Sequence, residues 1–229
     1  MSLPESGRVA VYYAPPPEDP LFSLAAAWLG RDPESGAVVA QPDIPGLDEV
    51  TAEPRLYGFH ATLKPPMRLR AGIGWDELVS AAIDLAAGIA PFVLPSMAVA
   101  DVHGFLALRE TEPSPELQAM ADLCVACLDE FRAAPTEAEL ARRRRAGLSP
   151  GQNAMLRRWG YPYVFGTWFF HMTLTRRLSA EEKVRYRPAA ERHFAPALSA
   201  PRWVSDICLF TQSEPGHPFL LGARLPLRG

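Results

Sequence analysis

The amino-acid sequence predicts an α+β fold of two similar halves, each with the order β-α-β-α-β-β, whose mainly antiparallel sheets face a central cleft. Strand-like and helix-like segments follow one another in the same order twice. The pattern Phe-His-x-Thr-Leu occurs in both halves, at residues 59–63 and 170–174, and Val-Ala-Asp-Val at 99–102 is matched by Val-Ser-Asp-Ile at 204–207. Such repetition indicates a duplicated unit, so we expect residues 1–229 to form a single bilobal domain.

The first half is expected to alternate strands and helices around residues 55–64. β-branched and aromatic residues predict a first strand, which ends at three consecutive prolines. A helix is expected to follow and to end at Gly30. The next stretch is rich in Pro, Asp, Glu and Gly, which is typical of a long surface loop. The expected segments are a strand at 8–14, a helix at 21–30, a loop at 31–54, a strand at 55–64 ended by Pro65 and Pro66, a helix at 76–90, and a strand pair around a turn at 103–104.

The second half is expected to repeat this order around residues 167–176. Ser179 with Glu182 three residues later has the spacing of a capping box, which predicts the start of a helix. The expected segments are a helix at 116–133, a charged helix at 136–147, a strand at 167–178, a helix from 179, and two closing strands at 203–212 and 218–227.

Composition excludes several classes of protein. The 229 residues are 48% apolar and 21% charged, as in ordinary globular enzymes. The formal charge of −3 gives no basic surplus of the kind that long polyanion binders carry. No apolar stretch approaches the roughly 20 residues of a membrane span, and the first ten residues lack the core of a signal peptide. We therefore expect a cytoplasmic protein with no membrane association, and no protein partner is evident.

The two Phe-His-x-Thr-Leu segments carry the predicted chemistry. Side chains alternate between the faces of a strand, so His60, Thr62 and Lys64 are expected to share one face, as are His171 and Thr173 in the second half. Two histidines with pKa values near 6.5 can supply a base and an acid at neutral pH. Hydroxyl donors can bind the oxygens of a phosphate as charge develops on them. The residues thus predict cleavage of a phosphate ester without a metal.

These paired segments resemble the H-x-[ST] signatures of the two-histidine (2H) phosphoesterase superfamily, which includes the LigT-like RNA-end enzymes and cyclic nucleotide phosphodiesterases. Residues 8–32, YGFHATLKPP and FGTWFFHMTLT are similar to a bacterial branch associated with phosphonate metabolism. The resemblance implies a bilobal fold, no cofactor, and a small cyclic or linear phosphodiester as substrate, such as a ribose cyclic phosphate, a phosphonate-pathway ester, a nucleotide or an RNA end. It also implies that His60 and His171 are catalytic and that Thr62 and Thr173 bind phosphate.

Residues near the motifs are further candidates. Lys64 is expected to neutralise a phosphate oxygen. Tyr161 and Tyr163 precede the second motif in an expected loop and are candidates for substrate contacts. Arginines at 142–145, 157 and 158 make the stretch before the second motif the natural place for a substrate lid, although most basic runs are solvated helix faces. Cys124 and Cys127 lie in the middle of an expected helix, where a redox or metal role is disfavoured.

Three alternatives remain open from sequence. Both histidines could be core residues bonded to a neighbouring threonine. The protein could instead hold a nucleotide or RNA end without turning it over, although a non-catalytic binder would be expected to lose one histidine. A metallohydrolase is the third alternative, but metal sites usually add Asp, Glu or closely spaced His residues, which the H-x-T motif does not supply.

Overall fold

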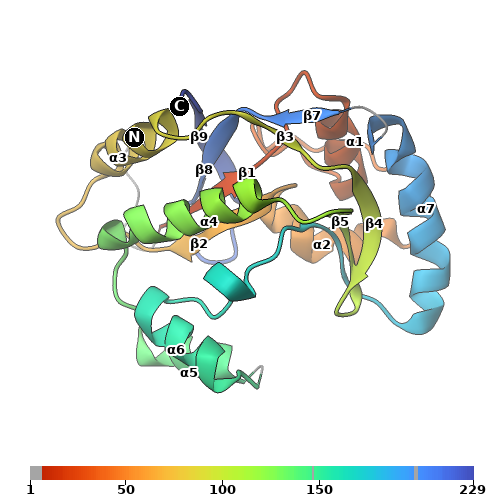
Figure 1. The fold of residues 1–229 in the computed structure, drawn as a ribbon. Coiled ribbons are helices and arrows are strands. Elements are labelled where there is room, and N and C mark those ends of the chain that lie inside the picture. Colours follow the sequence, from red (N-terminus) through yellow and green to blue (C-terminus); the bar gives the residue numbers. More distant parts are fainter. Residues whose placement is uncertain (1–6, 146, 199–200) are drawn as a thin grey trace.

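A seven-stranded antiparallel sheet forms the centre of the protein in the computed structural model, which describes residues 7–145, 147–198 and 201–229. The strands are ordered β4-β5-β6-β2-β1-β8-β9 (Figure 1). The predicted α+β, mainly antiparallel fold class is confirmed. The strands of this sheet are β1 (Arg8–Tyr13), β2 (Ala61–Met67), β4 (Met97–Val102), β5 (Phe105–Glu110), β6 (Met172–Arg177), β8 (Asp206–Gln212) and β9 (Leu220–Pro226). A second, two-stranded sheet pairs β3 (Phe92–Leu94) with β7 (Arg202–Val204).

The element order repeats, as β1-α1-β2-α3-β3-β4 and then β5-α4-β6-α7-β7-β8. The sequence predicted the repetition but placed residues 105–110 in the first half, as the second strand of the pair around 103–104. Additional helices lie at the same place in each half, immediately before the motif strand: α2 before β2, and α5 with α6 before β6. The helices are α1 (Pro20–Leu29), α2 (Leu47–Tyr57), α3 (Trp75–Ala87), α4 (Pro115–Cys127), α5 (Glu137–Arg144), α6 (Pro150–Trp159) and α7 (Ala180–Leu198), with 3-10 turns η1 (Asp129–Phe131) and η2 (Phe165–Thr167).

The two halves exchange strands and meet at the centre of the sheet. β4 pairs with β5 of the second half, and β8 pairs with β1 of the first. The motif strands β2 and β6 are neighbours, and in the described part of the chain they are in register only at Ala61 and Met172. Beyond this position the two motif strands do not pair with each other, although β2 continues to pair with β1 and β6 with β5.

Alternation along β1 separates the two faces of the sheet. Val9, Val11 and Tyr13 are buried in the main core, which also contains side chains of α1, α3, α4 and α7. Figure 1 shows α4 lying along β2 and α7 at the edge near β4. Ala10 and Tyr12 point to the opposite face, into a small second cluster that includes Phe210 and Phe219. The large core thus covers one face of the sheet, and the opposite face carries only this small cluster.

The segment before the first motif differs from the prediction. Residues 47–57 form helix α2, where the sequence predicted the end of a loop and the start of a strand. Leu47, Val50, Thr51 and Pro54 are its buried residues, at helical spacing. The polar composition of 31–54 concealed that period. Strand β2 begins only at Ala61, and it continues through both prolines to Met67.

The segment before the second motif contains a helix that the prediction missed. Ser149 caps α6 by accepting a hydrogen bond from the Gln152 amide at 3.2 Å, Pro150 occupies its first turn, and Gly160 ends it in the left-handed region at φ 73°. Each of these is a known helix-boundary signal, so the sequence did contain the helix. Helix α4 ends at Cys127, earlier than the predicted 133. The capping box of Ser179 and Glu182 is confirmed, with the Ser179 amide donating to Glu182 at 2.7 Å.

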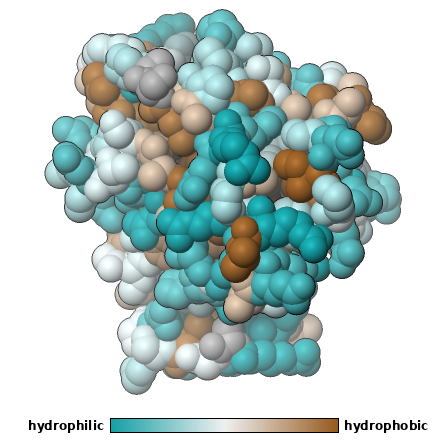
Figure 2. Space-filling view, turned by 90° about the vertical axis from the view of Figure 1, so that its right-hand side faces the viewer, coloured by the Kyte–Doolittle hydropathy of each residue, from teal (hydrophilic) through white to brown (hydrophobic). Residues whose placement is uncertain are grey.

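One face of the surface is mainly hydrophilic. Figure 2 views the molecule from the side on which α7 lies in Figure 1, and only small, separated hydrophobic areas interrupt the polar surface there. Within the described residues, every helix is too short or too polar to cross a membrane.

Candidate active site

The two motif histidines have the same local geometry. Each lies one residue before its strand rather than in it, and each Nδ1 meets the backbone carbonyl two residues earlier: His60 with Gly58 at 2.9 Å, and His171 with Phe169 at 3.1 Å. A carbonyl oxygen only accepts hydrogen bonds, so Nδ1 carries the hydrogen in both rings. This fixes Nε2 as the nitrogen that is able to exchange a proton with a ligand.

The motif threonines lie beside these rings. Thr62 Oγ1 is 3.2 Å from His60 Nε2, and because Nδ1 holds the ring hydrogen, the hydroxyl donates to Nε2. The strands run antiparallel through the Ala61–Met172 pair, so the register places His60 next to Thr173 and Thr62 next to His171. The tertiary structure thus brings the two H-x-T motifs together at the junction of the halves. Trp168 adds a link between them by donating from its indole to the Thr62 carbonyl at 2.8 Å.

A cavity of about 1070 Å³ opens over this junction. His60, Thr62 and Thr173 line it directly, and His171 packs against the lining residue Phe105 with ring centroids 5.8 Å apart. The charged residues that line the cavity are mostly basic, namely Arg8, Arg68, Arg142, Arg143, Arg176 and Arg177, against Glu53 and Glu139. The cavity is therefore rich in positive side chains although the whole chain carries a formal charge of −3.

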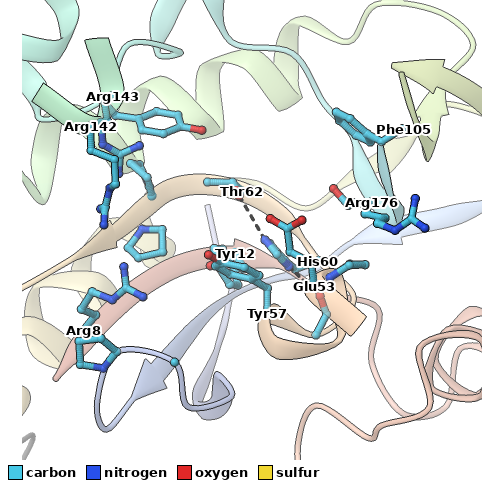
Figure 3. Close-up of a pocket in the computed structure, with 18 of the residues that line it drawn as sticks. Arg8, Tyr12, Glu53, Tyr57, His60, Thr62, Phe105, Arg142, Arg143 and Arg176 are labelled. Carbon is cyan, nitrogen blue, oxygen red and sulfur yellow. Dashed lines mark hydrogen bonds between the residues drawn. The ribbon is translucent and has the colours of Figure 1, made fainter. Parts of the chain in front are cut away.

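Tyr12 and Tyr57 form the wall around His60. The Tyr12 ring stacks on the His60 ring with centroids 3.6 Å apart, and Tyr57 lies 6.3 Å from it (Figure 3). The Tyr12 hydroxyl is buried and has no hydrogen-bond partner in the described part of the protein. Sequence analysis selected neither Tyr12 nor Tyr57 as a site residue. The alternation of Arg8, Ala10 and Tyr12 against Val9, Val11 and Tyr13 was the signal that could have found Tyr12.

Burial lowers the pKa of both histidines. Loss of hydration lowers the pKa of His60 to about 4, the hydrogen bond to the Gly58 carbonyl acts in the opposite direction, and the charge of nearby His171 lowers it further. Burial also lowers the pKa of His171, helped by the positive charges of Arg109 and His103 and opposed by the Phe169 carbonyl. Both rings are thus neutral at pH 7 in the unliganded protein, and an anionic ligand would favour the return of a proton.

Lys64 lies elsewhere than the sequence predicted. Its side chain is buried, and its ammonium donates to the Val125 carbonyl at 3.0 Å and contacts Asp129 at 3.4 Å, beneath the C-terminal end of α4. Register shifts between β1 and β2 occur between Val9 and Tyr12, opposite this part of β2. These irregularities break the alternation after Leu63, so Lys64 turns to the core face and does not line the cavity. Burial lowers its pKa to about 8.

The other predicted contacts divide into those that reach the cavity and those that do not. Tyr161 lines it, while Tyr163 lies edge-on to the Tyr161 ring at 5.5 Å and supports it from outside the lining. Of the predicted arginine-rich stretch, Arg142 and Arg143 line the cavity. Arg158 instead binds Asp129 at 3.1 Å. Arg8 was missed because it lies far from the motifs in sequence, whereas Arg68 and Arg176, eight and five residues after the motif histidines, were overlooked.

The donor set at the site is poor in metal ligands. In the portion of the chain that the structure describes, no three His, Cys, Asp or Glu side chains are grouped so that they could hold a metal ion.

Cys124 is buried and burial raises the pKa of its thiol to about 12, whereas Cys127 is exposed, so the two do not form a matched reactive pair.

Comparison with known proteins places this chain in a family. Residues 62–220, more than half of the chain, match the model of the family described as "Protein of unknown function (DUF1045)", and the chain belongs to that family. It is 41% identical over 231 residues to a ribose 1,5-bisphosphate phosphokinase PhnN of Janthinobacterium sp. (strain Marseille), and 37% identical over 217 residues to the protein of that name from Laribacter hongkongensis (strain HLHK9). The matches cover 97% and 93% of this chain but 51% and 50% of those proteins. The chain therefore spans about half the length of these curated relatives.

Solved structures of phosphoesterases are also similar. E. coli LigT complexed with 3'-AMP matches over 98% of this chain and 100% of its own, with a TM-score of 0.46 and 14% identity. A second structure, described only as a phosphoesterase, matches over 100% of both chains with a TM-score of 0.45 and 14% identity.

Proposed function

We propose that this protein is a metal-independent phosphoesterase that hydrolyses a small cyclic phosphodiester, with His60 and His171 as general base and acid. The observation that carries the proposal is the matched geometry of the two H-x-T motifs. Each ring is held through Nδ1 by a backbone carbonyl and leaves Nε2 for proton transfer. His60, Thr62 and Thr173 line one cavity rich in arginine, and His171 packs against its lining residue Phe105. If both histidines were only core residues bonded to a neighbouring threonine, nothing would require the two motifs to meet beside a shared cavity.

The chemistry follows from these positions. One neutral Nε2 takes a proton from water as the water oxygen bonds to phosphorus. The bond from phosphorus to one ring oxygen of the diester breaks, and the other, protonated histidine donates its proton to that oxygen. The product is a phosphate monoester beside a free hydroxyl. Thr62 and Thr173 donate hydrogen bonds to the non-bridging oxygens, where negative charge increases in the transition state. When phosphate is bound, the Thr62 hydroxyl turns from His60 Nε2 to the ligand and frees that nitrogen.

The lower pKa of His60 favours it as the base, because it is the more readily kept neutral. His171 would then be the acid, protonated when the anionic diester binds. The relatives' name refers to a ribose bisphosphate, which supports a cyclic phosphodiester on ribose as the substrate class. Opening such a ring leaves a ribose phosphate monoester.

The purified protein is expected to hydrolyse at least one cyclic phosphodiester in a panel of ribose 1,2-cyclic phosphates and nucleoside 2',3'-cyclic phosphates. Turnover should persist in excess chelator, because imidazole and hydroxyl groups handle the reacting charges in this mechanism. Phosphate-monoester formation, followed by ³¹P NMR, is the measurement. Loss of activity with chelator and its recovery with a divalent metal would favour a metallohydrolase instead. Binding without turnover at any pH would favour a non-catalytic binding protein.

The pH dependence should be bell-shaped and displaced toward acid. The base must be neutral, which requires a pH above the His60 pKa of about 4. The acid must be protonated, which in the free enzyme requires a pH below the lowered pKa of His171. We expect kcat/KM, which reports the free enzyme, to be greatest below pH 6.5. The optimum of kcat should lie at higher pH, because the bound anion raises both pKa values. A kcat/KM that is constant from pH 5 to 8 would contradict this assignment.

A further inference from the structure

One end of the cavity is built from arginines that the catalytic proposal does not use. Arg8 comes from the start of β1, and Arg142 and Arg143 come from α5 in the additional segment before the second motif. In Figure 3 these three side chains gather on one side of the cavity, with Tyr12 and His60 at the centre and Arg176 on the other side. The same three arginines also line a small adjoining recess of about 50 Å³.

The charges at this end are only partly neutralised within the described residues. Glu139, the acidic residue that lines both cavities here, is bound to Arg68 at 3.2 Å and to the Thr136 amide at 2.7 Å. In the described residues, neither Arg8, Arg142 nor Arg143 has a carboxylate partner. Burial lowers the pKa of Arg143, the positive charges of Arg142 and Arg8 lower it further, and Tyr161 and Glu139 act in the opposite direction. An anion bound between them would relieve that repulsion.

Two of the three guanidinium groups are held in place before any ligand arrives. Arg8 Nε donates to Gln212 at 2.7 Å, and its guanidinium carbon lies 5.5 Å from the centre of the Phe219 ring. Arg143 stacks over the Tyr161 ring at 4.7 Å. These contacts leave the terminal nitrogens of both side chains available. A fixed planar guanidinium with free donors suits the oxygens of a phosphate group.

The position of Arg8 relates this end to the catalytic centre. Arg8 and Tyr12 lie on the same face of β1, four residues apart, and Tyr12 stacks on His60. Strand geometry separates their Cα atoms by roughly 13 Å, and the Arg8 side chain lines the same cavity as His60. A small phosphorylated sugar could reach both places at once.

We propose that Arg8, Arg142 and Arg143 form a second phosphate subsite, so that the substrate is a ribose cyclic phosphodiester that also carries a phosphate monoester away from the ring. This inference rests on the proposed function and makes its substrate class narrower. The H-x-T motifs hold the diester that reacts, and the arginine subsite holds the monoester that does not. The subsite supplies affinity and orientation, and it takes no part in bond cleavage.

The test compares substrate pairs that differ only in the remote phosphate. The probes are ribose 1,2-cyclic phosphate and adenosine 2',3'-cyclic phosphate, each with and without a 5-phosphate. For at least one ring type, the 5-phosphorylated member should have the higher kcat/KM in the unmodified protein. Arg142→Gln/Arg143→Gln should lower kcat/KM for that member by about 10–100-fold, the range for losing a hydrogen bond to a charged group. The same variant should change kcat/KM for the substrate without the 5-phosphate only slightly. Arg157→Gln is the control, because Arg157 is exposed on α6 and does not line the cavity.

Equilibrium binding separates failure of the subsite from failure of the proposed function. In the His60→Ala/His171→Ala variant the diesters stay intact, so affinity for both members of each pair can be measured by calorimetry. Tighter binding of the 5-phosphorylated member would support the subsite if this preference is lost when Arg142→Gln/Arg143→Gln is added. That result would hold even if the unmodified protein hydrolyses none of the probes. Equal affinity for both members of each pair would overturn the subsite, even if the protein hydrolyses them all.

Discussion

Replacing His60 or His171 by alanine is expected to lower turnover of a cyclic phosphodiester by about 10²–10⁴-fold, the contribution of one positioned acid or base. Each variant removes the Nε2 that its motif presents for proton transfer. Loss of both rings should cost less than the product of the two single losses, because base and acid act in the same step. Single-turnover rates at saturating substrate measure this effect without interference from substrate binding.

His193 supplies a matched control for these variants. Its Nε2 lies 2.8 Å from the Leu24 carbonyl and its ring packs against Trp28, so it is also a half-buried ring bonded to the backbone, but it lies on α7 and not at the junction of the motif strands. His193→Ala should reduce stability in urea unfolding and leave turnover near that of the unmodified protein. If His60→Ala and His171→Ala behave in the same way as His193→Ala, then the motif histidines are structural and the catalytic proposal is wrong.

Thr62→Val and Thr173→Val are each expected to lower turnover by about 10–1,000-fold. Valine keeps the shape of threonine but removes the hydroxyl that donates to the phosphate oxygens as their charge increases. Thr→Ser should have a much smaller effect, because the donor remains. The loss should appear in kcat, since the hydrogen bond is stronger in the transition state than in the bound substrate.

Thr51→Val is the control for loss of a buried hydroxyl. The Thr51 hydroxyl donates to the Leu47 carbonyl at 2.7 Å within α2 and lies outside the cavity lining. This variant should change the free energy of unfolding without changing kcat. Equal turnover of the valine and serine variants at Thr62 and Thr173 would show that these hydroxyls do not contact the reacting phosphate.

The sequence by itself determined what local patterns can encode. The turn at His103 and Gly104 between β4 and β5 follows from strand propensity and from a glycine that adopts φ 102°. The start of α7 follows from its capping box. The duplicated order and the pair of H-x-T motifs were evident because both copies keep the same residues at the same spacing. Helix α6 was encoded as clearly, by Ser149, Pro150 and Gly160, and was overlooked.

Only the tertiary structure decided which side chains share the cavity. Strict alternation predicted that Lys64 would lie beside His60, but the irregular pairing of β1 with β2 turns it toward α4 and Asp129. Such an irregularity depends on the partner strand, so β2 alone cannot reveal it. Arg8 and Arg143 likewise converge because β1 and α5 are brought together by folding. Local propensity fixes how a residue is presented on its own element, whereas long-range pairing fixes which elements face one another.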